Sequence, residues 1–391
     1  MNASFDVVIV GGGVTGAAVG YGLAKRGVKT CLVDAVPTFS RASRANMGLI
    51  WCQSKALGCP QFVRWGFASS RAYGKLAAEL KELSGIDTGY APTGGIIPCL
   101  GEAELEARAK FIEKLRAETE DGTYPASVLS RRELEGMLPK VPFGPEVSGG
   151  IWSDMDGYVD PLHLMFAFRK SFVRLGGTLF AGERVSEVKP SGKGYTLVCG
   201  GRTLECGKVV LAAGLGVRKL AAQLGTDIPV FPNKSQVMLL ERIPADVLPI
   251  PLLGIARTFG GTVMIGAAHE NMGMDRRLTP EVLAANAQWA VRVWPELERK
   301  RILRFWTGLR VWPKDAYPIY DRIPGHENAF VFAMHSAVSL AAILEQALPD
   351  YVMGKPLPPD GAIFGLSRFA GGGSGFQGSA ASSPHAEAPN K

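Results

Sequence analysis

The chain opens with an apolar run that has the pattern of a buried strand. Residues 5–10, Phe-Asp-Val-Val-Ile-Val, are rich in β-branched side chains, and a second such run, 29–33, ends at Asp34. Between these runs lies a stretch with helical spacing, 17–26, which a glycine terminates. The glycine-rich stretch 11–16 joins the first run to the helical stretch. The pattern therefore predicts a strand–helix–strand unit in a parallel sheet.

Further along the chain, amphipathic helical patterns alternate with short strand-like runs. Apolar residues recur at intervals of three and four over 62–83, which predicts a long helix packed on a core. Short β-rich runs dominate 229–266 and predict an antiparallel sheet. The run 209–214 has the pattern of another buried parallel strand, so we expect the chain to return there to the first sheet. Other helices are predicted over 103–120, 161–175, 280–294 and 336–353.

Composition and charge narrow the class of protein. A hydrophobic fraction of 47% with 20% charged residues is typical of a soluble globular protein, and no apolar stretch is long enough for a transmembrane helix. The net charge of +7 comes without any run of lysine and arginine, which argues against nucleic-acid binding and is compatible with an anionic substrate. Residues 370–391 are rich in Gly, Ser, Ala and Pro, so we expect a disordered tail.

The six cysteines show no metal-ligand spacing. Cysteines in strand-like runs are usually small core residues in a reducing compartment, which predicts the cytoplasm. The same spacing predicts no iron–sulfur cluster and no metal site on this chain.

The glycine-rich turn has the GxGxxG spacing of a dinucleotide-binding site. Gly11 permits the sharp turn, Gly13 lets a pyrophosphate approach the backbone, and Gly16 allows close packing of helix on strand. The N-terminus of the following helix offers N–H groups and a positive dipole to phosphate. Asp34 would accept hydrogen bonds from ribose hydroxyls. The polar loop 40–50, in which small residues follow one another, is either a second phosphate-contacting segment or an ordinary surface loop.

Several motifs together resemble the D-amino-acid-oxidase-like family of FAD-dependent oxidoreductases. They are GGGVTG, SRASRANMGLI, VVLAAGLGV, GTVMIGAAHE, WTGLR and VFAMHSAVSLA. Their order and spacing match the family from Phe5 to about Met353. Within the family, SRANMGLIWCQSK and MHSAVSLA most resemble the FAD-bearing B subunits of bacterial opine oxidases and hydroxyproline dehydrogenases.

The resemblance implies an α/β fold of two domains. A Rossmann-like FAD-binding domain would be built from the discontinuous segments 1–90, 140–220 and 300–355. An inserted domain with an antiparallel substrate-binding sheet would comprise 91–139 and 221–299. The splitting of the nucleotide-type strands independently favours FAD over NAD.

The resemblance also implies which residues bind FAD. The ADP half would lie on the glycine-rich turn, the pyrophosphate and flavin edge along the polar loop, and the flavin pyrimidine at the start of the last helix. The residues are Gly11, Gly13, Val14, Thr15, Gly16, Asp34, Ala35, Ser43, Arg44, Asn46, Met47, Gly48, Leu49, Val185, Ala213, Gly214, Gly308, His335, Ser336, Ala337, Val338 and Ser339.

Arg310, in the WTGLR motif, is the residue that the resemblance assigns to the substrate. A guanidinium can grip an α-carboxylate with its planar fork. The alternative is a structural salt bridge from Arg310 to Asp315 or Asp321. Arg257 is a second catalytic candidate. Ala337 stands where glycine oxidase has a second arginine, so glycine itself is not the expected substrate.

The expected reaction is the oxidative cleavage of a C–N bond in an amino-acid-type secondary amine, such as the opines octopine and nopaline. Hydride transfer to flavin N5 would be followed by hydrolysis of the imine. The alternatives are a hydroxyproline or D-amino-acid dehydrogenase, and a flavin-holding structural subunit of a larger redox assembly. The resemblance further implies a hetero-oligomer with a second redox subunit that carries further cofactors, and a dehydrogenase rather than an oxidase.

Overall fold

One half of the fold contains an eight-stranded sheet. Its first strand has a parallel neighbour on each side. The structure is a computed structural model that describes residues 3–35, 42–266, 268–373 and 375–376. Strand β1 (Ala3–Val10) pairs in parallel with β2 (Thr30–Asp34) and with β11 (Arg202–Leu211). The predicted strand–helix–strand unit and the predicted return of the chain to the first sheet are confirmed. The other strands are β8 (Thr178–Ala181), β9 (Val185–Ser191), β10 (Gly194–Cys199), β16 (Ile319–Ile323) and β17 (His326–Ala333).

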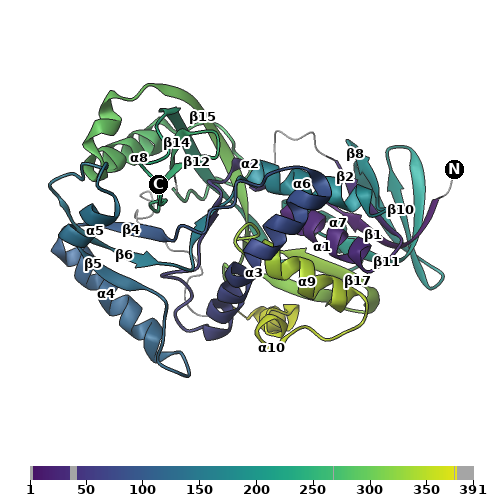
Figure 1. Cartoon of the computed structure of the whole chain (residues 1–391). Coiled ribbons are helices and arrows are strands. Elements are labelled where there is room, and N and C mark those ends of the chain that lie inside the picture. Colours follow the sequence, from purple (N-terminus) through teal and green to yellow (C-terminus); the bar gives the residue numbers. More distant parts are fainter. Residues whose placement is uncertain (1–2, 36–41, 267, 374, 377–391) are drawn as a thin grey trace.

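Four helices pack together beside this sheet (Figure 1). They are α1 (Val14–Lys25), α3 (Pro60–Ser84), α6 (Pro161–Arg174) and α9 (Ala341–Val352). Helix α1 approaches α9 closely, because a Cβ atom on Gly22 would lie only 2.2 Å from the carbonyl oxygen of Glu345. The apolar side chains of these helices form one continuous buried cluster with the inner face of the sheet.

The other half of the molecule contains two antiparallel sheets. The larger has the order β13 (Ile255–Arg257), β14 (Thr262–Gly266), β12 (Val230–Arg242) and β15 (Ile302–Pro313). The smaller consists of β4 (Gly95–Leu100), β6 (Val147–Ser153) and β5 (Ser127–Ser130). Helix α8 (Pro280–Val293) packs against β12, β14 and β4. The predicted antiparallel sheet and the α/β class are confirmed.

The remaining elements are short or peripheral. Strands β3 (Leu49–Ile50) and β7 (Gly157–Tyr158) form a small antiparallel pair. The other helices are α2 (Ala42–Ala45), α4 (Glu102–Ala117), α5 (Arg131–Met137), α7 (Val217–Ala222), α10 (Pro359–Ala362) and the 3-10 helices η1 (Gly214–Gly216), η2 (Pro295–Arg299) and η3 (Leu366–Gly372).

Two strands that were predicted for the FAD-binding domain pair instead with strands that were predicted for the other domain. Strand β6 was expected in the FAD-binding domain, but it pairs with β4 and β5. Its glycines allow this close pairing, since a Cβ on Gly149 would lie 2.2 Å from the carbonyl oxygen of Leu129. Strand β15, also expected in that domain, pairs along its length with β12. The division into two domains itself stays a prediction.

The cysteines lie in the core, as their strand-like settings in the sequence predicted. All six cysteines are free and buried. The described residues contain no cluster of His, Cys, Asp or Glu that could hold a metal ion. None of the described helices is long and apolar enough to cross a membrane.

The C-terminal segment packs on the body beyond the expected boundary at Ala370. Phe376 lies against the rings of Tyr317 and Phe364, with centroid distances of 5.2 and 5.8 Å. Its backbone N–H donates to the Asp315 carboxylate over 3.2 Å. Phe376 therefore contacts the body, whereas residues 370–372 are exposed, and the expected disorder of the tail stays a prediction. Residues 377–391 lie outside the described residues.

We predict that Phe376→Ala lowers the free energy of unfolding by about 1–3 kcal/mol, because a partly buried aromatic ring loses its contacts. Chemical denaturation of the two proteins measures this difference. Val173→Ala, at a side chain that is 47% exposed, is the matched control and should change stability by less than ~0.5 kcal/mol. An equal effect of the two substitutions would show that Phe376 does not dock on the body.

Candidate functional site

The glycine-rich turn between β1 and α1 lies directly over the end of β11. Gly11 has φ +107°, and a Cβ there would lie 2.4 Å from the carbonyl oxygen of Ala212. A Cβ on Gly16 would lie 1.8 Å from the carbonyl oxygen of Gly11. No other residue type fits these two positions without displacing the backbone. The turn therefore has the tight shape that a dinucleotide-binding loop requires.

The N-terminus of α1 faces the polar loop. The N–H of Val14 donates to Ser43 Oγ over 3.0 Å. A Cβ on Gly13 would also lie 3.0 Å from Ser43 Oγ, so the side chain of Ser43 lies against the helix terminus. Helix N–H groups and a hydroxyl at one point suit the oxygens of a pyrophosphate, so these residues fit the ADP half of FAD. Thr15 belongs to the first turn of the same helix.

Asp34, at the end of β2, forms a buried ion pair with Arg169 of α6. Asp34 is 5% exposed and Arg169 is 8% exposed. Arg169 Nε and Nη2 also donate to the carbonyl oxygen of Gly12, over 2.9 and 2.6 Å. One arginine thus joins the glycine-rich turn to the acid that is expected to bind ribose. The sequence analysis missed Arg169, although a cation on the apolar side of a predicted helix was a signal for it.

Other predicted nucleotide-binding residues lie around Asp34 and the ends of the parallel strands. The N–H groups of Gly182 and Glu183 donate to the carbonyl oxygen of Asp34, which places the segment leading to Val185 beside it. Ala35 directly follows Asp34. Ala213 and Gly214 follow the end of β11, next to Gly11.

The polar loop connects the parallel sheet to the antiparallel sheet. Asn46 Nδ2 donates to the carbonyl oxygens of Ala42 and Ser43, and Asn46 Oδ1 accepts from Gly48 N over 2.8 Å. Met47 packs in a buried cluster with residues of β12 and β14. Arg44 lies in α2, and Leu49 pairs with Tyr158.

Strand β15 lies directly against α2. A Cβ on Gly308 would lie 2.5 Å from the Cβ of Ala45. Trp306 Nε1 donates to the carbonyl oxygen of Ala45 over 3.3 Å. The structure therefore brings Gly308 against Ala45 of the polar loop, and its expected contact with FAD stays a prediction.

The segment from His335 to Ser339 precedes the last helix rather than starting it, because α9 begins at Ala341. Ser336 has φ +64°, which interrupts helical geometry. Side chains replace the missing helical hydrogen bonds: Tyr73 OH donates to the carbonyl oxygen of Val338, and Ser69 Oγ to that of Ser339. The expected helix start at these residues, which include Ala337, is therefore wrong.

Arg310 is a half-buried cation held by neutral groups. Its Nη1 donates to Asn233 Oδ1 over 3.0 Å and to the carbonyl oxygen of Ala268 over 2.8 Å, and its Nη2 donates to Ser235 Oγ over 2.8 Å. Within the described residues Arg310 forms no ion pair. Burial lowers the pKa of the guanidinium to about 10, although Glu270 favours the charged form.

The alternative role for Arg310, a salt bridge to Asp315 or Asp321, is not what the structure shows. Asp315 pairs with Arg368, whose Nε lies 2.8 Å from Asp315 Oδ2. Asp321 accepts from the backbone N–H of Leu366. Both carboxylates therefore stabilise the C-terminal segment.

Two histidines and a tryptophan lie beside Arg310. The ring of Trp312 is 5.2 Å from the ring of His269 and 4.6 Å from that of His335. Burial and the charge of Arg310 lower the pKa of His269 to about 3, and the same two causes lower the pKa of His335 well below its usual value. Both rings are therefore neutral at physiological pH, and the cluster presents one permanent charge among uncharged groups.

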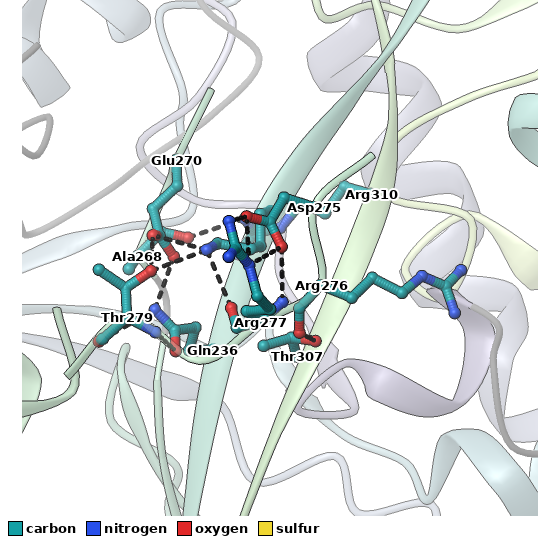
Figure 2. Close-up of polar contacts among 10 residues, drawn as sticks. Gln236, Ala268, Glu270, Asp275, Arg276, Arg277, Thr279, Thr307 and Arg310 are labelled. Atoms are coloured by element: carbon teal, nitrogen blue, oxygen red, sulfur yellow. Dashed lines mark hydrogen bonds and ion pairs between the residues drawn. The ribbon is translucent and has the colours of Figure 1, made fainter. Parts of the chain in front are cut away.

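The opposite face of β12 carries a buried polar network that fixes the segment following β14. Lys234 and Glu270 form an ion pair of 3.1 Å, with side chains 1% and 4% exposed. Glu270 also accepts from Gln236 Nε2 and Thr279 Oγ1, each over 2.8 Å, and Figure 2 shows these side chains pointing toward one another. Because every partner is hydrogen-bonded, the network holds Ala268 and His269 in place beside Arg310.

A buried lysine that the sequence analysis missed lies at the other side of the cluster. Lys55 Nζ donates to the carbonyl oxygen of Trp51 over 2.6 Å, and burial lowers its pKa. Lys55 lines a small cavity together with Ser336 and Ser339. Ser339 Oγ accepts from Trp51 N over 3.0 Å, which joins the segment before α9 to the end of the polar loop.

Arg257, the second catalytic candidate, does not join this cluster. It lies on β13, at the opposite edge of the sheet from β15, and its Nε donates to the carbonyl oxygen of Ile243. By strand register Arg257 stands level with Ile302, at the far end of β15 from Arg310. Only Arg310 of the two predicted arginines lies at the junction of the two halves.

Comparison with known proteins gives consistent matches over nearly the whole chain. A family model described as FAD dependent oxidoreductase matches residues 6–344. A protein of Agrobacterium tumefaciens (strain Ach5) that is named as a subunit of opine oxidase is 33% identical over 365 residues, which cover 93% of this chain and 97% of that protein. Glycine oxidase of Geobacillus kaustophilus is 27% identical over 378 residues, covering 95% and 99% of the two chains.

Solved structures agree with these sequence matches. The crystal structure of glycine oxidase from Geobacillus kaustophilus has a TM-score of 0.86 and 28% identity, and covers 94% of this chain and 99% of that chain. L-proline dehydrogenase from P. horikoshii has a TM-score of 0.82 with 20% identity, and the match covers 95% and 100% of the two chains. The second likeness shows the fold alone.

We predict that Arg169→Met destabilises the protein by about 3–5 kcal/mol, because it leaves the Asp34 carboxylate buried without its cation. The double variant Arg169→Met with Asp34→Asn should be more stable than the single Arg169→Met variant, since no charge is then stranded. Denaturant unfolding of the four proteins in this cycle measures the coupling. Strictly additive effects would contradict the buried pair.

A second prediction concerns Asp156, which accepts hydrogen bonds from Cys52 N and from the side chain of Gln53. Burial raises the pKa of Asp156 to about 7, from 3.8 in the unfolded chain. The folded protein therefore holds this proton more tightly, so the stability that it contributes is full below pH 4 and is lost as the pH rises toward 7.

Between pH 5 and pH 8 the free energy of unfolding should therefore fall by about 2–3 kcal/mol more in the wild type than in Asp156→Asn. Denaturant unfolding at the two pH values measures both differences, and the variant is the control for all other titrating groups. Equal pH dependence in the two proteins would mean that Asp156 is not buried as a protonated acid.

Proposed function

The chain belongs to the family of FAD-dependent oxidoreductases, and from that premise we propose that it oxidises an amino-acid-type secondary amine at its C–N bond. FAD is the cofactor of this family, and the residues around the glycine-rich turn fit it. The proposal concerns the substrate and the residues that bind it.

The observation that carries the proposal is the half-buried guanidinium of Arg310, which has no carboxylate partner among the described residues. Its three hydrogen bonds go to an amide, a backbone carbonyl and a hydroxyl, none of which carries a charge. A buried charge is costly unless an opposite charge compensates it. A substrate carboxylate would supply that charge, and the planar fork of arginine suits it. We therefore assign to Arg310 the role of holding the α-carboxylate of the substrate.

The other groups of the cluster favour an uncharged environment around the reacting carbon. His269 and His335 are neutral, and Trp312 lies between them. Neutral rings beside the guanidinium lower the local polarity, which would strengthen its interaction with a carboxylate. FAD, when bound, accepts the hydride that leaves the α-carbon of the substrate. The chain itself supplies binding, alignment and exclusion of water.

An opine-type substrate is favoured by three observations together. The relative with 33% identity is named as part of an opine oxidase, and the match covers 97% of that protein. The net charge of +7 suits a substrate with several carboxylates. By the resemblance, the small residue Ala337 stands where glycine oxidase has a second arginine, which favours a substrate larger than glycine. A hydroxyproline or D-amino-acid dehydrogenase is the alternative that uses the same carboxylate grip, and hydride transfer followed by imine hydrolysis would serve either substrate.

We further propose that the chain works beside a second redox subunit. The name of the relative describes it as one subunit of an enzyme, and this chain offers no described cluster of residues for a further metal centre. Electrons would then leave through the partner rather than directly to oxygen. A flavin-holding subunit without its own activity is the other reading, and the cytoplasm stays the predicted compartment because the cysteines are free.

We predict that Arg310→Lys and Arg310→Met reduce kcat/KM by about thirty- to a thousandfold, because a charge-assisted bond in a buried site is worth about 2–4 kcal/mol. Lysine keeps the charge but loses the bidentate fork, so Arg310→Lys should retain little of the wild-type kcat/KM. Steady-state kinetics with an artificial electron acceptor measures the effect, and flavin content should not change.

The matched control is Arg257→Met, which removes an arginine from the same sheet but away from the cluster. It should leave kcat/KM within about twofold of wild type, since it touches no part of the site. If Arg310→Met keeps near-normal kinetics, or if it loses FAD, the role assigned to Arg310 is wrong.

A further inference from the structure

We propose that Arg310 and Asn233 together hold His269 in the tautomer that accepts a hydrogen bond from the amine of the substrate. This inference rests on the proposed function, in which Arg310 holds the carboxylate of the same molecule. It assigns His269 a substrate-binding role and Asn233 a positioning role. The sequence analysis singled out neither residue.

The orientation of the Asn233 amide follows from the chemistry of Arg310. A guanidinium only donates hydrogen bonds. Nη1 of Arg310 lies 3.0 Å from one terminal atom of Asn233, so that atom must be the oxygen. The other terminal atom, Nδ2, then donates to Asn271 Oδ1 over 3.3 Å. The amide therefore has one orientation that satisfies both neighbours.

The tautomer of His269 follows from the orientation of Asn233. His269 Nδ1 lies 3.0 Å from the same Asn233 oxygen. Because that oxygen only accepts, Nδ1 must carry the hydrogen. Burial and the nearby charge of Arg310 keep the ring neutral, with a pKa of about 3. A neutral ring has one N–H, so Nε2 of His269 carries a lone pair and no hydrogen.

The place of His269 beside Arg310 makes this lone pair relevant to the substrate. Ala268, the residue before His269, accepts from Arg310 through its carbonyl oxygen. Arg310 Nη1 and His269 Nδ1 each lie 3.0 Å from the same Asn233 oxygen, so the imidazole lies beside the carboxylate-binding group, with Trp312 against its ring. In an α-amino acid a single carbon separates the carboxylate from the amine. We infer that a ligand with its carboxylate on Arg310 would have its N–H group close to the ring of His269.

The lone pair on Nε2 of His269 would favour ligands that carry an N–H group beside the carboxylate over ligands that carry an oxygen there. An N–H group can donate a hydrogen bond to Nε2. An ether oxygen at the same place would bring its own lone pair against that of Nε2, and no hydrogen bond could form between them. This selection requires the Nδ1–H tautomer, because the other tautomer would present an N–H group and favour the oxygen. A purely structural histidine, which only completes the hydrogen bonding of Asn233, would show no such preference.

Two planar carboxylates of the same shape test this prediction directly. Pyrrole-2-carboxylate carries an N–H group beside its carboxylate, and furan-2-carboxylate carries an oxygen at that position. Each is titrated into the purified FAD-bound protein, and the dissociation constant is measured from the change in the flavin absorption spectrum. The wild type should bind the pyrrole about ten- to a hundredfold more tightly, since an unmade buried hydrogen bond costs about 1–3 kcal/mol.

Variants separate the roles of the three residues. His269→Phe should bring the ratio of the two constants close to one while the furan still binds, and the retained furan affinity shows that the site is folded. Asn233→Leu should reduce the ratio, because the ring can then adopt either tautomer. His269→Gln, whose amide can present an oxygen, should restore part of the preference.

The outcomes distinguish this inference from the proposed function. Arg310→Met should weaken both ligands together, and unchanged binding of the furan in that variant would overturn the carboxylate grip. Failure of both ligands to bind the wild type would overturn both proposals. If the wild type binds the two ligands equally, or if His269→Phe keeps the wild-type ratio, His269 does not accept from the amine while the grip of Arg310 stands.

Discussion

The uncompensated charge of Arg310 is the constraint on which the organisation of the site depends. Glu270 belongs to the same part of the chain, but Lys234 holds it on the opposite face of β12. The face toward Arg310 carries the neutral polar side chains of Asn233 and Ser235. Successive side chains of β12 point to opposite faces of the sheet. One face therefore carries the ion pair of Lys234 with Glu270, and the other contacts Arg310 through neutral side chains. In the proposed function, the carboxylate of the substrate supplies the anion that pairs with Arg310.

The close approach of two backbones brings this cation to the cofactor half of the protein. Gly308 lies against Ala45, and Trp306 donates to the carbonyl oxygen of the same residue. On the other side of the junction, Ser339 joins the segment before α9 to Trp51 at the end of the polar loop. The site is therefore built where three segments far apart in the sequence meet, and each is fixed by a backbone contact. Such fixation suits a reaction that depends on alignment more than on a protein base.

Local patterns predicted the parts of this structure that depend on local rules. The strand–helix–strand unit follows from periodicity and from the glycine spacing, whereas Arg310 was a candidate only because its motif resembles that of known enzymes. Arg169 was missed, since its partners Gly12 and Asp34 are distant in sequence. The late start of α9 was missed because side chains of α3 replace its first hydrogen bonds. His269 depends on contacts between a loop and two strands, which no periodicity records.

The central claim, that a half-buried arginine recognises the carboxylate beside the oxidised C–N bond, is tested most directly from the side of the substrate. The purified FAD-bound protein is mixed without oxygen with an N-substituted amino acid and, separately, with its α-methyl ester, and the bleaching of the flavin is followed. The account predicts that the free acid reduces the flavin at least about thirtyfold faster than the ester, because the ester cannot compensate the charge of Arg310. Reduction by the ester at the rate of the acid would contradict it.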